Sequence, residues 1–307
     1  MNPKLLLPAL LLSASLSASA QDWAKAQLAK SPRHTEYVTV KNGARDVLCW
    51  VAYPEVKDKA TAVLVIHDSS GLTDWARLSA DELAAAGYIA IVPDFLSGSG
   101  PKGGGSSSFP GQSELDLALK KLTTPQILGD LDAAAKYVKT LPSANGKLVI
   151  VGFCLGGSQA SIAACNRTDL QAVCVFYGWP PKPADGIKNI RCPVYGFYGE
   201  NDARVTVTVP QGQTDMKAAG KTFAPVIYTG AGHGFMAHGD PAYPLTSPDA
   251  TAANRQARDQ AWARLLDLLK KIPAPLTASP PQTASPAPPA SAAPPHSPPP
   301  ASPPPAA

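Results

Sequence analysis

The stretch VIVGFCLGGSQA (residues 149–160) joins an apolar, β-rich run to a small-residue helical pattern, and Cys154 stands where one gives way to the other. Glycines lie on both sides of the cysteine, as a sharp turn from strand to helix requires. The stretch therefore predicts a strand–turn–helix unit with a cysteine at the turn. Three roles for this cysteine stay open at this point: a nucleophile, a disulfide partner or a buried apolar side chain.

Apolar runs like the one before Cys154 recur along the chain and alternate with segments of helical spacing. A short continuous apolar run is typical of a strand buried on both faces of a sheet. This alternation predicts an α/β fold, with a mostly parallel central sheet flanked by helices on both faces. Two runs around Asn42-Gly43 predict an N-terminal hairpin. The expected hairpin strands are 35–40 and 47–54, the buried strands are 60–68, 88–95, 147–154, 170–178, 192–200 and 223–230, and the helices are 78–86, 124–141 and 253–272.

Residues 97–113, SGSGPKGGGSSSFPGQS, interrupt the alternation. Glycine and serine offer little apolar area, so we expect no packed element in this segment. The segment is either a mobile flap that closes over a small or moderately sized substrate, or a loop without a role in function.

The two ends of the chain differ in composition from its middle. Residues 1–20 combine Lys4, an apolar core and the small residues 18–20, which together predict a secretory signal cleaved before Gln21. Residues 273–307 include 15 prolines among 35 residues and favour an extended, disordered tail. The sequence therefore predicts one α/β domain over 21–272, in a protein exported to the periplasm or the cell exterior. The tail is expected to be a spacer or to contact the envelope or a proline-binding module.

Charge and residue spacing exclude several classes of protein. The formal net charge is only +4 over 307 residues and the basic residues are scattered, so the chain lacks the footprint of a nucleic-acid-binding protein. No stretch of the predicted domain is long and apolar enough to span a membrane. The cysteines and histidines lack zinc-type spacing, and nothing implies a metal or an organic cofactor. We expect a monomer that acts on small molecules.

Two more polar side chains follow predicted strands. Asp202 comes after strand 192–200 in GENDARV, and His233 comes after strand 223–230 in GAGHGF. Because ligands of such sheets bind beyond the carboxyl ends of strands, we expect these side chains to meet Cys154 there. A thiolate can attack a carbonyl carbon, an imidazole can carry its proton, and a carboxylate can orient the imidazole. The order nucleophile, acid, histidine is that of α/β-hydrolases.

Taken together, GFCLGG, GENDARV and GAGHGF resemble the motifs of the dienelactone hydrolase family, cysteine hydrolases with the α/β-hydrolase fold. The similarity extends from LVIHDSSGL (residues 64–72) to the last helix. It implies that Cys154, His233 and Asp202 form a catalytic triad, and that the backbone N–H groups of Leu155 and Ser69 form the oxyanion hole. It also implies hydrolysis of small esters or lactones, like that of a carboxymethylenebutenolidase, through a thioester intermediate.

Two positions differ from the family pattern. In the family a glutamate commonly follows strand 60–68 and pairs with the resting thiol, whereas this chain has Asp68, which is our candidate for gating the thiol. The dienelactone enzyme binds its substrate carboxylate with arginines, one of them four residues beyond the catalytic histidine, where this chain has Ala237. The resemblance therefore predicts the chemistry and leaves the substrate open.

Aromatic residues near the strand ends are candidates for the substrate pocket. Tyr177, Trp179 and Tyr198 either line this pocket or fill its rim. The function we expect is that of an exported hydrolase of esters or lactones. The alternative is a non-catalytic binding or envelope-associated protein that keeps the fold.

The remaining cysteines leave two structural alternatives and one chemical alternative open. They either form up to two disulfides or pack as unpaired apolar side chains. Thiol redox chemistry would need a resolving cysteine close to Cys154, and Cys165 lies roughly 16 Å along the predicted helix, which is too far. The four cysteines concerned are Cys49, Cys165, Cys174 and Cys192.

Overall fold

The structure is a computed structural model that describes residues 15–272, with side chains from Asp22 onward. Most of the predicted signal, residues 1–14, and the predicted tail, residues 273–307, lie outside the described residues. Among the helices of the described part, none has the length and apolar character needed to cross a membrane.

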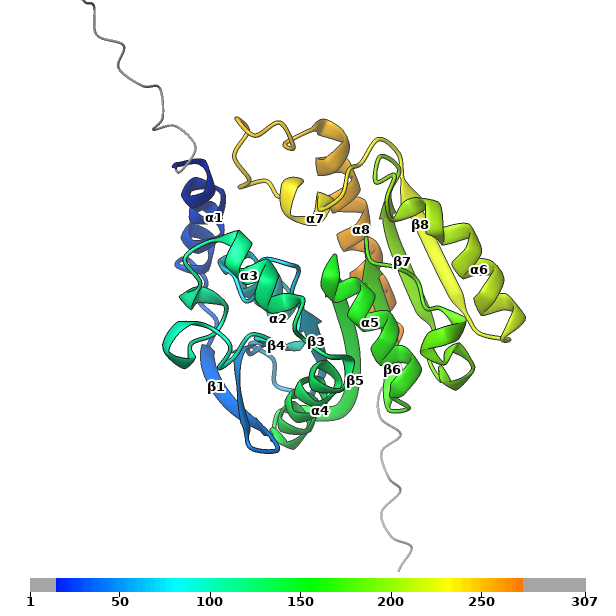
Figure 1. Cartoon of the computed structure of the whole chain (residues 1–307), viewed down its shortest axis with the longest axis horizontal. Coiled ribbons are helices and arrows are strands. Elements are labelled where there is room, and N and C mark those ends of the chain that lie inside the picture. The colour runs from blue at the N-terminus through cyan, green and yellow to red at the C-terminus, as the bar shows by residue number, and fades with distance from the viewer. Residues whose placement is uncertain (1–14, 273–307) are drawn as a thin grey trace, which may run out of the picture. The chain divides into compact units, whose positions relative to one another are not determined.

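A single eight-stranded sheet runs through the described chain in the order β1-β2-β4-β3-β5-β6-β7-β8 (Figure 1). Strand β2 pairs antiparallel with β1 on one side and with β4 on the other, and the remaining pairs of neighbouring strands are all parallel. The N-terminal hairpin and the mostly parallel sheet predicted from the sequence are confirmed. The strands are β1 (Thr35–Asn42), β2 (Arg45–Ala52), β3 (Ala60–Ile66), β4 (Ile89–Pro93), β5 (Ala144–Phe153), β6 (Leu170–Phe176), β7 (Val194–Gly199) and β8 (Phe223–Tyr228).

Helices cover both faces of the sheet (Figure 1). One face packs against α1 (Ser15–Leu28), α2 (Asp74–Ala85) and α8 (Ala252–Lys270), and the other against α4 (Thr124–Thr140), α5 (Leu155–Asn166) and α6 (Val209–Ala218). Each face has its own apolar cluster because side chains alternate across the strands. The short helices are α3 (Gln112–Leu119), α7 (Phe235–His238) and the 3₁₀ turns Pro101–Gly103, Ser106–Ser108, Pro183–Asp185, Ile187–Asn189 and Thr206–Thr208.

Threonine caps fix where three of the long helices begin. Thr73, Thr123 and Thr251 precede α2, α4 and α8, and each side-chain oxygen accepts a hydrogen bond from the N–H three residues on, at 3.3, 3.3 and 3.0 Å. An N-cap of this kind satisfies a backbone donor that has no partner within the helix. The cap at Thr73 also ends the loop that follows β3, which lies beside Cys154.

Residues 97–113 pack more closely than their composition predicted. Asp94, which is 2% exposed, accepts hydrogen bonds from the Ser106 N–H and hydroxyl at 2.7 and 2.5 Å. The Gln112 side chain donates to the Ser69 carbonyl at 2.9 Å. The expectation of an unpacked segment is therefore wrong, because a buried carboxylate supplies acceptors in place of apolar contacts.

All five cysteines lie in the described chain and none is in a disulfide. Cys49, Cys165, Cys174 and Cys192 are buried in the apolar clusters, and burial raises the pKa of each thiol. Of the two structural alternatives left open by the sequence, the structure has unpaired, packed cysteines.

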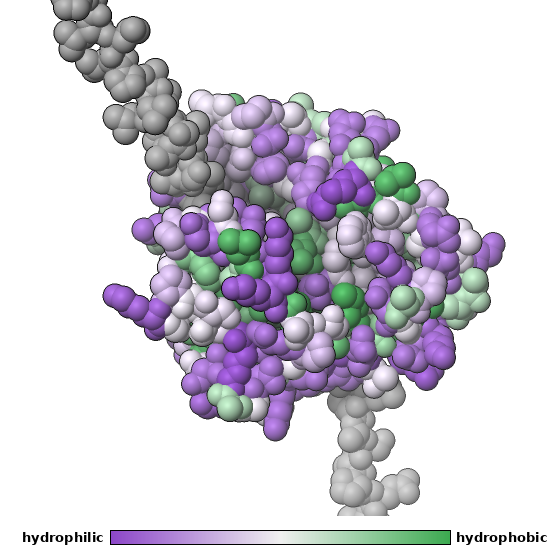
Figure 2. Space-filling view, viewed as in Figure 1, coloured by the Kyte–Doolittle hydropathy of each residue, from purple (hydrophilic) through white to green (hydrophobic). Residues whose placement is uncertain are grey.

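Strand β8 forms one free edge of the sheet and has Pro225 near its middle. The Tyr228 carbonyl accepts a hydrogen bond from the Glu200 N–H, so it faces β7. The backbone N–H and C=O groups of successive residues in a strand point in alternate directions, so those at position 225 point towards the free edge of the sheet. The neighbouring side chains of Val226 and Ile227 are 36% and 47% exposed. On the face seen in Figure 2, exposed apolar residues lie in small separate patches.

Candidate active site

Three loops at the carboxyl ends of parallel strands bring Cys154, Asp202 and His233 together. Cys154 directly follows β5, Asp202 follows β7 and His233 follows β8. His233 Nε2 lies 3.0 Å from Cys154 Sγ, and His233 Nδ1 lies 2.5 Å from Asp202 Oδ2. The histidine thus joins a thiol and a carboxylate in one chain of hydrogen bonds.

A strained backbone holds Cys154 at the turn between β5 and α5. Its φ of 54° and ψ of −112° lie where side-chain-bearing residues are rare. Its N–H donates to the Phe176 carbonyl at 3.0 Å, which ties the turn to the end of β6. A Cβ at Gly152 or Gly156 would lie 2.1 or 2.2 Å from a backbone oxygen, so only glycine fits at either position. The close packing of strand, turn and helix thus requires the glycines that surround the cysteine.

His233 is poised to hold a proton. Burial lowers the pKa of its imidazole, but the hydrogen bonds to Cys154 and Asp202 outweigh burial and raise the pKa to about 9. Asp202 is 5% exposed, so its carboxylate interacts with the imidazole in a medium of low dielectric constant. The arrangement favours an imidazolium next to the sulfur.

The oxyanion hole predicted from the sequence consists of two backbone N–H groups, those of Leu155 and Ser69. Leu155 and Ser69 line the same cavity as Cys154. Leu155 begins α5, where the backbone N–H has no acceptor within the helix. The Ser69 loop is held by Gln112, which donates to its carbonyl.

Asp68 makes a local turn. Its Oδ1 accepts a hydrogen bond from the Ser70 N–H at 2.8 Å, and the structure gives no hydrogen bond between Asp68 and Cys154. Burial raises the pKa of this carboxyl, while the Ser70 N–H and the nearby His67 lower it. In the described state the partner of the thiol is therefore His233, and thiol gating by Asp68 stays a prediction.

A cavity of about 380 Å³ opens beside Cys154. Tyr177 and Trp179 line it, as does Arg204, whereas residues 97–113 do not. Arg204 was not predicted from the sequence, although it stands only two residues after Asp202. The complete lining is Ser69, Cys154, Leu155, Ser158, Gln159, Ile162, Tyr177, Trp179, Arg204 and Val205.

Tyr198 does not line this cavity, which corrects its prediction as a pocket residue. The side chain is 0% exposed and packs edge-on against Phe223, with ring centroids 6.5 Å apart. Tyr198 and its neighbour Phe197 belong to the apolar clusters on opposite faces of the sheet. Alternation along β7 therefore directs Tyr198 into the core beneath α6.

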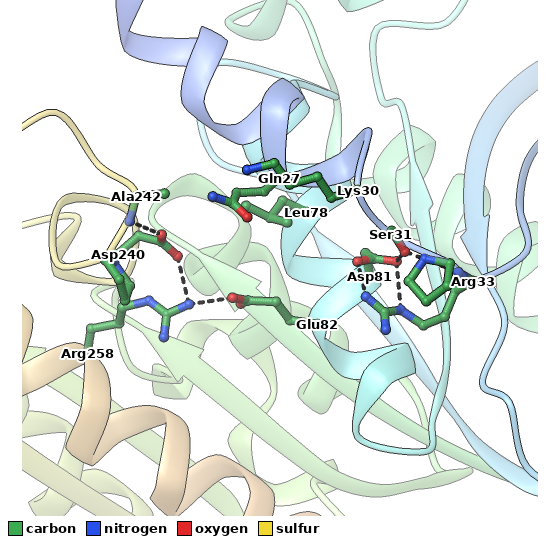
Figure 3. Close-up of a pocket in the computed structure, with 12 residues that line it drawn as sticks. Gln27, Lys30, Ser31, Arg33, Leu78, Asp81, Glu82, Asp240, Ala242 and Arg258 are labelled. Atoms are coloured by element: carbon green, nitrogen blue, oxygen red, sulfur yellow. Dashed lines mark hydrogen bonds and ion pairs between the residues drawn. The ribbon is translucent and has the colours of Figure 1, made fainter.

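A larger cavity, of about 520 Å³, lies between α1, α2 and α8 and contains neither Cys154 nor His233 (Figure 3). In its wall one Arg258 nitrogen donates to Glu82 and Asp240, at 2.5 and 2.8 Å. Burial raises the pKa of Glu82 to about 7. This ion cluster joins α2, α8 and the segment that follows His233.

Metal-binding groups are not apparent at either cavity. Within residues 15–272 as described, no three His, Cys, Asp or Glu side chains are grouped so that they could hold a metal ion.

Comparison with known proteins finds a matching family and several relatives in sequence. The model of the family described as "Dienelactone hydrolase family" matches residues 48–273. A protein of Methylorubrum extorquens assigned as a carboxymethylenebutenolidase is 28% identical over 220 residues, which cover 68% of this chain and 71% of that protein. A Bradyrhizobium protein assigned as a 2-oxo-3-(5-oxofuran-2-ylidene)propanoate lactonase is 28% identical over 229 residues, covering 70% of this chain and 90% of that protein.

The solved structures agree with this match at the level of the fold. A crystal structure of a protein of Klebsiella pneumoniae assigned as a dienelactone hydrolase has a TM-score of 0.66 and 24% identity, over 78% of this chain and 99% of that chain. The α/β-hydrolase fold predicted from the sequence is confirmed.

Proposed function

The chain belongs to the dienelactone hydrolase family and is a hydrolase of ester or lactone bonds, and we propose that it works through a Cys154–His233–Asp202 triad and a thioester intermediate. The observation that carries this proposal is the 3.0 Å distance between His233 Nε2 and Cys154 Sγ. A nucleophile within hydrogen-bond reach of a base, which is itself oriented by a third group, is the geometry that covalent catalysis needs.

The first half of the reaction forms the thioester. The Cys154 thiol gives its proton to His233 Nε2, and the thiolate attacks the carbonyl carbon of the substrate. The carbonyl electron pair moves onto oxygen, which accepts hydrogen bonds from the Leu155 and Ser69 N–H groups. When the tetrahedral intermediate collapses, the C–O bond breaks and the alcohol oxygen takes the proton from Nε2.

The second half returns the enzyme to its starting state. A water molecule gives a proton to His233 Nε2 while its oxygen attacks the thioester carbon. Collapse of this second intermediate breaks the C–S bond and releases the carboxylic acid, and the leaving sulfur takes the proton from Nε2, which regenerates the Cys154 thiol. Asp202 stays ionised and stabilises the imidazolium in both halves.

The size and charge of the cavity point to the class of substrate. A volume of about 380 Å³ suits a small ester or lactone. Arg204 brings a positive charge to an otherwise uncharged lining, so we propose that substrates with an anionic group are preferred.

The test of the function compares wild type with Cys154→Ala on aryl esters and five-membered lactones. We expect kcat to fall at least about 10³-fold in the variant, because the nucleophile is lost. Cys192→Ala is the matched control, since it removes a buried cysteine outside the cavity. Wild-type activity in Cys154→Ala would end the proposal that a thioester forms.

We also propose that the protein is exported and loses residues 1–20. Support comes from the signal pattern in the sequence, with Lys4, an apolar core and small residues before Gln21. Mass spectrometry of the protein from its native cells should give Gln21 as the first residue, and a chain that retains Met1 would contradict export. The role of the tail as a spacer or contact segment stays a prediction.

A further inference from the structure

The end of β6 carries a second strained residue beside the site. Tyr177 has a φ of 37°, a value that is rare for any side-chain-bearing residue and more so for a bulky one. In the described chain only Lys102, Cys154 and Tyr177 combine a side chain with positive φ. The strain at Cys154 is explained by its place at the turn that carries the proposed nucleophile. Tyr177 is not a nucleophile, so its strained backbone needs a separate explanation.

Fixed contacts on both sides keep Tyr177 in this conformation. Its N–H donates to the Phe197 carbonyl at 2.8 Å. The residue before it, Phe176, accepts the hydrogen bond from the Cys154 N–H, and the residue after it, Gly178, would place a Cβ 2.4 Å from the Gly157 carbonyl carbon. The end of β6 is thus locked to β7 on one side and to the turn at Cys154 on the other.

The conformation places the Tyr177 ring against the histidine. The ring centroids of Tyr177 and His233 are 5.1 Å apart, with the planes inclined at 61°. The same ring packs edge-on against Phe235, two residues beyond the histidine, at 5.3 Å and 73°. Tyr177 is 2% exposed, so it cannot turn out of the way without opening the core.

We propose that Tyr177 is a positioning residue, whose ring fixes the plane of the His233 imidazole so that Nε2 faces Cys154 while Nδ1 faces Asp202. This inference rests on the proposed function, because it assigns Tyr177 a role in the same triad. Two hydrogen bonds to a histidine leave its ring free to tilt about the line that joins them. An aromatic ring packed at a steep angle against the imidazole restricts that tilt.

The ring of Tyr177, rather than its hydroxyl, restricts the tilt of the His233 imidazole. The contacts of Tyr177 with His233 and Phe235 are ring-to-ring contacts. Burial, with the nearby charges of Asp68 and Cys154, raises the pKa of this hydroxyl well above its ordinary value, so it stays protonated in neutral solution. We therefore expect phenylalanine at this position to hold the His233 imidazole in the same plane as tyrosine does.

The experiment measures how fast iodoacetamide alkylates Cys154 as a function of pH, together with kcat and KM for an aryl ester. The variants are Tyr177→Phe, which keeps the ring, and Tyr177→Leu, which removes it. Tyr177→Asn is a second ring-less variant, because asparagine adopts positive φ more readily than leucine and guards against misfolding. Tyr198→Leu is the matched control, since it removes a buried tyrosine from the opposite face of the sheet.

In Tyr177→Leu and Tyr177→Asn we expect the alkylation midpoint to lie at higher pH than in the wild type, because the imidazolium no longer faces the sulfur, and kcat to fall tenfold to hundredfold by rough estimate. Tyr177→Phe and Tyr198→Leu should keep the wild-type midpoint. An unchanged midpoint in both ring-less variants, or a shifted midpoint in Tyr177→Phe, would overturn the inference. Alkylation needs no substrate, so this readout still decides the role of Tyr177 if the wild type proves unable to hydrolyse esters.

Discussion

Arg204, an exposed residue, is the one Lys, Arg, Asp or Glu in the described lining of the cavity at Cys154. A hydrogen bond to a charged group is worth about 1.5–3 kcal/mol. For esters that carry a carboxylate, Arg204→Gln should therefore lower kcat/KM tenfold to hundredfold by rough estimate, while neutral esters of the same size are little affected. Steady-state kinetics on such a pair of substrates measures the difference.

The matched control for Arg204 is Arg191→Gln, which removes an exposed arginine that does not line the cavity. It should leave both substrates unaffected. An equal loss on charged and neutral esters in Arg204→Gln would show that Arg204 does not recognise the anionic group.

His233 makes the stability of the fold depend on pH. Its pKa is raised from 6.5 to about 9 in the folded state, so the folded state binds the proton more tightly than the unfolded state. The stabilisation is fully present below pH 6.5 and is lost as pH rises to about 9. The difference in free energy of unfolding between wild type and His233→Gln should therefore shrink across this interval in urea titrations.

Cys154→Ala serves as the comparison for this pH dependence, because it removes one of the two partners that raise the histidine pKa. Its free energy of unfolding should decline less between pH 6.5 and about 9 than that of the wild type. A decline that is equal in both proteins would contradict the assignment of Cys154 as a partner of the imidazole.

At the scale of residues, the sequence predicted which polar side chains meet at the site, and it did so because each follows an apolar strand. Cys154, Asp202 and His233 needed only the rule that strand ends converge. The sequence predicts less well which way a side chain points near the end of a strand, because a shift of one position moves the side chain to the other face of the sheet. That is why Tyr198 was misplaced and Arg204 was missed.

Helix α1 shows how an element can depend on a few contacts. Trp23 is 9% exposed and packs edge-on against Tyr243, at 5.8 Å between ring centroids. Trp23→Ala should cost about 3–5 kcal/mol of the free energy of unfolding, as is typical of a buried tryptophan. Urea titration of the chain that begins at Gln21 measures this cost.

Trp179→Ala is the control for Trp23, because the Trp179 ring is 43% exposed and loses less contact when truncated. Its cost should be well below that of Trp23→Ala. Equal costs in the two variants would mean that α1 does not stabilise the domain through Trp23.

Elements without an apolar stripe escaped the sequence analysis. In α6 the buried residues are Val209, Gly212 and Met216, and in α3 the single buried residue is Leu115. Periodicity detects a helix through its apolar face, and these faces are too small to stand out. Helices α4 and α8 bury several apolar residues each and were predicted to within a few residues of their ends.

For the whole molecule, alternation of strands and helices sufficed to predict the layers of the fold but not the order of the strands. The sheet places β4 between β2 and β3, and β5 beside β3, so chain order and spatial order differ. Such pairing is decided by contacts between distant parts of the chain, which local patterns do not report. The predicted domain over 21–272 contains all the described strands.

The ion pairs of Arg258 also join parts of the molecule that are far apart in the chain. It binds Glu82 of α2, which is 176 positions away in the chain, and Asp240, which lies beyond α7 (Figure 3). The loop that carries His233 is thereby tied to the helix that follows the Ser69 loop. The sequence offers no sign of this bond, because each partner taken alone is an ordinary charged residue.

Pro225, at the free edge of the sheet, matters for how this protein avoids assembling with copies of itself. An exposed strand with free N–H groups is a template on which fibrils grow, and the apolar side chains next to Pro225 would favour such growth. Proline has no N–H to offer at the outward position and interrupts the ladder that a further strand would need. One residue thus acts as a gatekeeper against polymerisation along that edge of the sheet.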